Sequence, residues 1–317
     1  MSQAFLTRGI KLAERGLIIM GKTNITEFKG MKGVPGYSMY GGMCQPAYIP
    51  SGYKLGEKPR GETSPGGSST GSAVAVTCGF APISIGTETS GCIASPAATA
   101  ALYALKLTPG SVSMEGILEL TACLDTLGTF GKTALDVALG CDALSTSSQG
   151  PTLASFVSSM KLQDVSVGFV DIEKWRLPAG TGNDDPKYLE QTAREYQQAK
   201  DMLRQSGVKV VDVYLTPPEE RMIGGMNVTE LIDKIIRYPM AAVPLGFIES
   251  SGRPYGLQAV AQAHQEAKLV RFMAACERVF PPRRQPDLEA CKKARPAYVG
   301  SSVVDPLLRD AYFMMGW

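Results

Sequence analysis

The sequence has little histidine, little tryptophan and almost no excess of charge of either sign. Its 317 residues include one histidine and two tryptophans, and lysine plus arginine outnumber aspartate plus glutamate by only 32 to 30. A nearly balanced charge provides no long-range attraction to nucleic acid or to an anionic membrane surface. Nucleic acid is therefore not an expected partner. The hydrophobic content of 44% is sufficient for the core of a globular protein.

Long apolar runs are also missing. The most apolar stretch, residues 73–85, is interrupted by Gly79 and Pro82 and is shorter than a helix that spans a bilayer. Residues 4–15 carry several charges and have no apolar segment of signal-peptide length. We therefore expect a cytoplasmic protein that does not cross a membrane.

The sequence contains no recognisable disulfide framework, metal motif or nucleotide motif. Its seven cysteines are odd in number and scattered, which favours reduced thiols. No group of histidine, cysteine, aspartate and glutamate residues has the spacing of metal ligands. The glycine-rich residues 64–72 do not form a P-loop, because Gly71 is followed by Ser72 and Ala73 rather than by lysine. We predict no metal and no cofactor.

Hydrophobic periodicity predicts an α/β protein. The expected helices are residues 4–16, 71–80, 96–105, 185–205 and 265–280. The expected strands are residues 17–20, 83–86, 165–170, 207–213, 241–245 and 256–261, and residues 27–63 are expected to form a long loop. We expect one domain over residues 1–280, with a central mixed β-sheet flanked by helices. A proline-rich, basic extension over residues 281–317 is expected to be solvated.

Two segments rich in glycine, serine and threonine carry the functional signal. Residues 64–72 place hydroxyl groups between glycines, and residues 86–96 read Gly-Thr-Glu-Thr-Ser-Gly-Cys-Ile-Ala-Ser-Pro. Together they resemble the two loops of the amidase signature. The resemblance continues through residues 21–28, 105–108, 116–118, 125–128, 132–136, 243–247 and 256–258. The chain is identified as a shortened, divergent member of the amidase signature family, similar to fungal amidases.

The resemblance implies a set of catalytic positions. The family uses a lysine, a serine in a cis peptide of the first loop and a nucleophilic serine in the second loop. Ser68 matches the cis serine, and the nucleophile position, 24 residues later, is occupied by Cys92. We expect the Ser68 hydroxyl to lie within hydrogen-bond reach of the Cys92 sulfur. The resemblance assigns the oxyanion hole and substrate-binding positions to Thr89, Ser90, Gly91 and Ser69, with the backbone N–H of Cys92 included in the oxyanion hole.

No lysine of this sequence matches the family's catalytic lysine. That lysine lies several tens of residues before the motif that contains Lys22, whereas only 21 residues precede Lys22 here. Lys54 and Lys58 lie in the variable loop and are weaker candidates. A cysteine thiol, with an ordinary pKa near 8.5, ionises without a strong base more readily than a hydroxyl. Cys92 therefore remains a candidate nucleophile. The sole histidine, His264, is expected at the surface.

The favoured function is that of an enzyme that acts on a carbonyl of a small molecule by acyl transfer or hydrolysis. The carbonyl belongs to an amide, an ester or a thioester. Cys92 would be the nucleophile and Ser68 would carry the proton. One alternative is an inactive amidase-like protein that binds or scaffolds, which is favoured by Ala94 at a position where the family often has arginine. Another is a cyclase or rearrangement enzyme of small-metabolite biosynthesis. Glu88 is expected to brace the second loop, and the sequence leaves a homodimer open.

Overall fold

The computed structural model describes residues 12–31, 33–57, 61–145, 150–174, 183–214 and 238–294. The helices, including the short 3-10 helices η1 and η2, are η1 (Glu27–Gly30), α2 (Thr70–Thr77), α3 (Ala94–Thr99), α4 (Ala134–Leu144), α5 (Leu153–Ser158), η2 (Leu162–Asp164), α6 (Pro186–Gln205), α8 (Glu266–Val279) and α9 (Leu288–Ala294). The strands are β1 (Tyr37–Ser38), β2 (Gly42–Met43), β3 (Ile83–Glu88), β4 (Tyr103–Lys106), β5 (Thr126–Gly131), β6 (Ser166–Val170), β7 (Lys209–Val213), β8 (Met240–Phe247) and β9 (Pro254–Val260).

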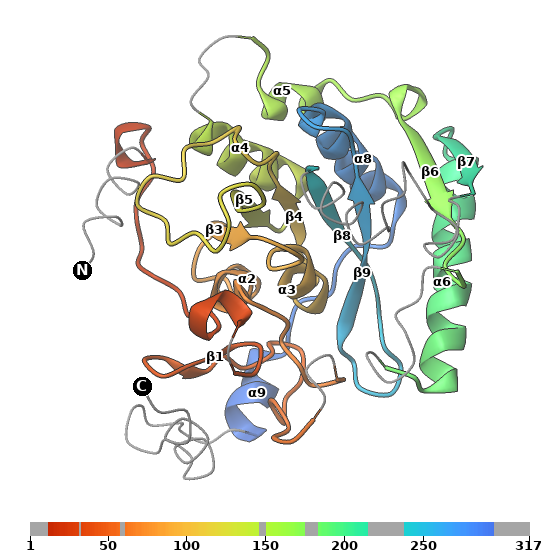
Figure 1. Cartoon of the computed structure of the whole chain (residues 1–317). Coiled ribbons are helices and arrows are strands. Elements are labelled where there is room, and N and C mark those ends of the chain that lie inside the picture. The colour runs from red at the N-terminus through yellow and green to blue at the C-terminus, as the bar shows by residue number, and fades with distance from the viewer. Residues whose placement is uncertain are drawn as a thin grey trace, which may run out of the picture.

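The centre of the protein is a five-stranded sheet with the order β3-β5-β4-β8-β9. Every neighbouring pair in this sheet is antiparallel, while β6 and β7 form a separate parallel pair beside α6 (Figure 1). The expected α/β fold with a central sheet flanked by helices is confirmed. In the described strands this central sheet is antiparallel throughout rather than mixed, since the parallel pair of β6 and β7 lies in a separate sheet. No helix in the described part of the chain has the length and hydropathy needed to span a membrane.

Helices cover both faces of the central sheet. Adjacent residues of a strand point to opposite faces, so each strand contributes side chains to two hydrophobic clusters. Leu105 and Leu127 belong to the larger hydrophobic cluster, in which α4 and α8 pack on one face. Ala104 and Phe130 belong to the smaller cluster, which α2 and α3 complete on the other face. The side chains on α2 and α3 in this cluster are small, so both helices lie close to the sheet. Their N-terminal ends carry the two signature segments.

Two of the expected elements are wrong. Residues 17–20 do not form a strand, and the side chain of Ile18 is 86% exposed. The helix expected over residues 96–105 ends at Thr99, and Ala101 adopts a left-handed backbone conformation with φ of 51°. Residues 103–106 then pair with β5 and β8 as strand β4. Pairing within the sheet therefore overrides the helix propensity of the alanine-rich sequence.

The first part of the C-terminal extension packs against the protein. Arg283 donates from Nε to the Ala101 carbonyl and from Nη2 to the Tyr48 hydroxyl, at 2.8 and 3.0 Å. The guanidinium of Arg284 lies 4.6 Å from the ring centroid of Phe247. Most of the residues from 281 to 294 are exposed, as a solvated extension would be, but the basic groups of Arg283 and Arg284 also find carbonyl and aromatic partners. Residues 295–317, like residues 4–11 of the first expected helix, lie outside the described part of the chain.

Candidate active site

The two signature segments meet between the start of α2 and the turn that joins β3 to α3. The backbone N–H of Ser69 donates to the Cys92 carbonyl over 3.1 Å. The Ser69 hydroxyl bonds both the carbonyl and the N–H of Thr87, each over 3.1 Å. Gly86 permits this approach, since a Cβ there would lie 2.8 Å from the Ser69 hydroxyl oxygen. Ser69 therefore joins the segments, and its hydroxyl is engaged within the protein.

Ser68 occupies the predicted backbone geometry but does not bond Cys92. The peptide between Gly67 and Ser68 is cis, as the resemblance implied. Ser68 is 2% exposed, and its hydroxyl has no hydrogen-bond partner among the described residues. The predicted hydrogen bond from this hydroxyl to the Cys92 sulfur is therefore wrong for this structure. The hydroxyl is left as a buried polar group that needs a partner.

The Cys92 sulfur lies beside main-chain oxygen atoms. It is 3.9 Å from the carbonyl oxygens of Lys29 and Ser90, to which the thiol donates. Cys92 is partly exposed, so a small molecule can reach the sulfur. No titratable side chain among the described residues forms a hydrogen bond with the Cys92 sulfur. Of the two lysines that the sequence offered as weaker candidates, Lys54 is exposed in the variable loop and Lys58 lies outside the described residues. In this arrangement the thiol points toward weak acceptors, the two main-chain oxygen atoms.

The turn before α3 leaves backbone donors beside the thiol. Within the described part of the chain, the N–H groups of Ser90, Gly91 and Cys92 donate no hydrogen bond. Gly91 has φ of +78°, and no atom lies within 4 Å of the position that its Cβ would take. These donors are thus available to an incoming oxygen atom. Such a cluster of amides is the kind of arrangement that stabilises the oxyanion of acyl transfer.

Glu88 braces this turn, as the sequence predicted. Its side chain is 2% exposed, and Oε2 accepts from the backbone N–H groups of Ile93 and Ala94 at 2.6 and 3.0 Å. The carboxylate therefore fixes the start of α3 immediately after Cys92. His264 is exposed and its N–H donates to the Thr108 hydroxyl, in agreement with its predicted surface position.

A buried ion pair beside the turn was missed by the sequence analysis. Lys29 Nζ lies 2.9 Å from Asp125 Oδ2, and the two side chains are 7% and 0% exposed. Asp125 Oδ1 accepts from the Thr89 hydroxyl at 2.5 Å, and Oδ2 accepts from the Leu120 N–H at 2.8 Å. The partners are 96 residues apart, so no local spacing reveals them. Nothing in the local sequence marks Lys29 as buried, since Phe28 and Gly30 on either side of it are exposed.

Hydrogen bonds lower the pKa of Asp125. Burial alone would raise this pKa, but the bonds from Thr89, Lys29 and Leu120 and the charge of Lys29 outweigh burial. A carboxyl group with a lowered pKa in the folded state contributes stability above its unfolded pKa. That contribution is lost as the pH falls through the folded pKa.

We therefore expect Thr89→Val to move acid unfolding to higher pH, because one of the bonds that lowers the pKa of Asp125 is removed. The measurement is a circular dichroism titration from pH 6 downward. Thr192→Val is the matched control, since the Thr192 hydroxyl bonds neutral carbonyls in α6. Equal midpoints for the two variants would contradict the role assigned to Thr89.

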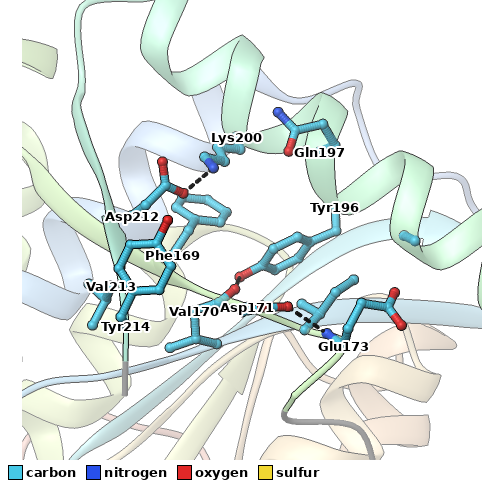
Figure 2. Close-up of a pocket in the computed structure, with 12 residues that line it drawn as sticks. Phe169, Val170, Asp171, Glu173, Tyr196, Gln197, Lys200, Asp212, Val213 and Tyr214 are labelled. Carbon is cyan, nitrogen blue, oxygen red and sulfur yellow. Dashed lines mark hydrogen bonds and ion pairs between the residues drawn. The ribbon is translucent and has the colours of Figure 1, made fainter. Parts of the chain in front are cut away.

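A separate hollow of about 270 Å³ lies where β6 and β7 end. Figure 2 shows Tyr196 of α6 with its hydroxyl toward the Val170 carbonyl, and Lys200 paired with Asp212. No residue of the two signature segments lines this hollow. The groups around Cys92 are therefore the candidate active site, and this hollow is not part of it.

Comparison with known proteins agrees with the signature. The family model described as Amidase matches residues 7–223, which is more than half of the chain. The chain belongs to the amidase family. It is 40% identical over 131 residues to one subunit of the glutamyl-tRNA(Gln) amidotransferase of Francisella tularensis subsp. mediasiatica. That match covers 41% of this chain and 24% of the relative, so the chain matches about a quarter of the relative's length.

Solved amidase-family structures have the same fold. The peptide amidase of Stenotrophomonas maltophilia superimposes with a TM-score of 0.68 at 22% identity, over 88% of this chain and 77% of that protein. The corresponding subunit of the glutamyl-tRNA(Gln) amidotransferase of Thermotoga maritima gives 0.65 at 19% identity, over 88% and 78%. At these identities the superpositions establish the fold alone, and the reaction depends on the residues of the site.

Proposed function

We propose that this amidase-family protein cleaves an amide bond of a small molecule, with Cys92 as the nucleophile and either water or an amine as the acyl acceptor. The names of its relatives, a peptide amidase and one component of an amidotransferase, favour an amide over an ester or a thioester. Hydrolysis and amido transfer share the acylation step, so the same residues serve both.

One observation carries the proposal. The Ser69 N–H donates to the Cys92 carbonyl, which joins the first signature segment to the second. The first segment carries the buried, unpaired Ser68 hydroxyl, and the second carries the partly exposed Cys92 thiol. The unpaired N–H groups of residues 90–92 lie on the same turn. A nucleophile, a hydroxyl without a partner and free oxyanion donors are the parts that acyl transfer requires.

The chemistry proceeds in two stages. In the first, the Cys92 sulfur attacks the substrate carbonyl carbon, the carbon–sulfur bond forms and the carbon–nitrogen bond breaks. The thiol proton leaves with the amine, and Ser68 passes it after a small movement of its hydroxyl. The N–H groups of residues 90–92 hold the negative oxygen. In the second stage, water or an amine attacks the thioester carbon, and a new carbon–oxygen or carbon–nitrogen bond forms as the carbon–sulfur bond breaks. The attacking group loses a proton, which returns to the sulfur, and the acid or the new amide leaves.

We expect Cys92 to be the thiol that reacts fastest with iodoacetamide at pH 7. Cys92 is partly exposed, and the unpaired N–H groups of residues 90–92 beside it can hold the carbonyl oxygen of the reagent. The measurement is peptide mass spectrometry after brief labelling. Cys123 is the control for a simple exposed thiol. Cys141 should stay unlabelled, because burial raises the pKa of its thiol to about 12. The proposal is wrong if Cys123 reacts faster than Cys92.

Acylation gives a second and more specific readout. Incubation with p-nitrophenyl acetate should release p-nitrophenolate and leave an acetyl group on Cys92, which peptide mass spectrometry detects. An inactive protein that only binds ligands would give no acetylated Cys92. That outcome would favour the binding or scaffold alternative.

A further inference from the structure

The backbone around Lys29 has an unusual conformation for residues other than glycine. Phe28 and Lys29 are consecutive and have φ of 44° and 56°, in the left-handed region. Left-handed backbone is unfavourable for residues with a Cβ and persists where surrounding contacts impose it. Phe28 is 58% exposed and therefore offers little packing. The contacts of the buried Lys29 therefore help to hold this turn.

The side chain of Lys29 reaches the second signature segment through Asp125. Asp125 accepts from Lys29 Nζ through Oδ2 and from the Thr89 hydroxyl through Oδ1. Thr89 directly precedes the residues with unpaired N–H groups. Since both charged side chains are almost fully buried, water does not compete for these bonds. A charge-assisted chain therefore runs from Lys29 to the first residue of the candidate oxyanion turn.

The main chain of Lys29 reaches the other components of the site. Its carbonyl oxygen lies 3.9 Å from the Cys92 sulfur. Its N–H donates to the Thr26 carbonyl, and the Thr26 N–H donates to the Ser68 carbonyl, each over 3.0 Å. One residue thus contacts the nucleophile and connects to both signature segments. Lys106 is also buried, but it donates to the Tyr238 carbonyl, which lies away from the two signature segments in sequence.

We propose that Lys29 is a positioning residue of the active site, which acts through Asp125 and Thr89 to hold the turn 89–92 against Ser68 and Cys92. This inference rests on the proposed function for its effect on rate. Its effect on the position of the turn does not depend on that function. The ammonium acts on the substrate only through Asp125 and Thr89.

The test compares Lys29→Met with Lys29→Arg, and Lys54→Met is the matched control because Lys54 is an exposed lysine of the same region. Acetylation of Cys92 by p-nitrophenyl acetate should be slower by about 10- to 100-fold in Lys29→Met, in kcat and not in KM. Lys29→Arg should recover most of that rate, because arginine keeps the charge and the donor. Lys54→Met should match the parent. All rates are measured well below each variant's Tm.

Two further variants keep the proposal testable if Lys29→Met does not fold. Lys29→Met combined with Asp125→Asn removes both buried charges together, which avoids leaving one uncompensated. Thr89→Val removes only the hydroxyl that Asp125 holds. We expect both to fold and to be slower by at least about fivefold, in the same direction as Lys29→Met. Folded variants with parental acetylation rates would overturn the proposal.

Hydrogen exchange separates failure of this inference from failure of the proposed function. Peptides that contain residues 89–92 should exchange faster in Thr89→Val and in the double variant, whether or not Cys92 is ever acylated. If the parent protein shows no acetylation but exchange changes in this way, the function is wrong and the positioning of the turn is upheld. Unchanged exchange would overturn the positioning even if Cys92 is the nucleophile.

Discussion

Cys92→Ala is expected to abolish acylation and turnover, because the variant has no atom that can attack the carbonyl carbon. Cys92→Ser should also be nearly inactive. A serine hydroxyl is far harder to ionise than a thiol, and no titratable side chain of the described residues bonds the group at position 92. The measurement is release of p-nitrophenolate from p-nitrophenyl acetate, with circular dichroism to show that the variants fold. A fully active Cys92→Ala variant would refute the nucleophile.

Ser68→Ala, made in the same series, separates the proton path from the nucleophile. Its rate should fall by roughly 10²- to 10⁴-fold, the range that is typical of lost general acid–base catalysis. The loss should be smaller than in Cys92→Ala, since a thiol ionises in part without help. A loss of less than about threefold would mean that the unpaired Ser68 hydroxyl takes no part in the reaction. The control is Ser113→Ala, because Ser113 lies outside both signature segments and its hydroxyl accepts from the N–H of Glu115.

Gly71→Ala is expected to cause the largest loss of stability. A Cβ at Gly71 would lie 2.4 Å from the backbone nitrogen of Asn24 and 2.5 Å from its carbonyl oxygen, and backbone atoms cannot move aside as a side chain can. The same pair forms a hydrogen bond from the Gly71 N–H to the Asn24 carbonyl. We expect the free energy of unfolding to fall by about 3 kcal/mol, and the Tm by about 5–10 °C.

Gly110→Ala is the control for this effect. Gly110 has φ of +83°, and no atom lies within 4 Å of the position that its Cβ would take. That substitution adds only the backbone cost of a left-handed residue, about 1–2 kcal/mol. Differential scanning calorimetry of both variants compares the two costs. A Gly71→Ala variant no less stable than Gly110→Ala would contradict the steric argument.

The sequence predicted the parts of the site that short motifs encode. Segments 64–72 and 86–96 could be paired because each contains its own spacing of glycines and hydroxyls. The bracing role of Glu88 followed from its place in the second segment. Segment 17–20 looked like a strand because it is apolar, yet Ile18 is exposed, since no neighbouring strand pairs with this segment. The hydrophobic pattern of a segment does not reveal whether a partner exists for it.

The site residues that were missed depend on contacts between distant parts of the chain. Asp125 belongs to the matching segment 125–128, but its carboxylate pairs with Lys29 and Thr89 across the fold, which the motif does not indicate. A lysine that ends in a buried ion pair has no distinct sequence pattern. The missing bond between Ser68 and Cys92 likewise depends on the rotation of two side chains, which a motif does not specify.

The contacts of Tyr48 have a consequence for how the protein is made. Its hydroxyl donates to the carbonyl of Arg284, 236 residues later, and accepts from the guanidinium of Arg283. At the usual synthesis rate of about 5–20 residues per second, Arg284 is added roughly 12 to 47 s after Tyr48. During that interval the loop around Tyr48 lacks these C-terminal partners. This side of the protein therefore acquires these contacts only after the ribosome has added Arg284.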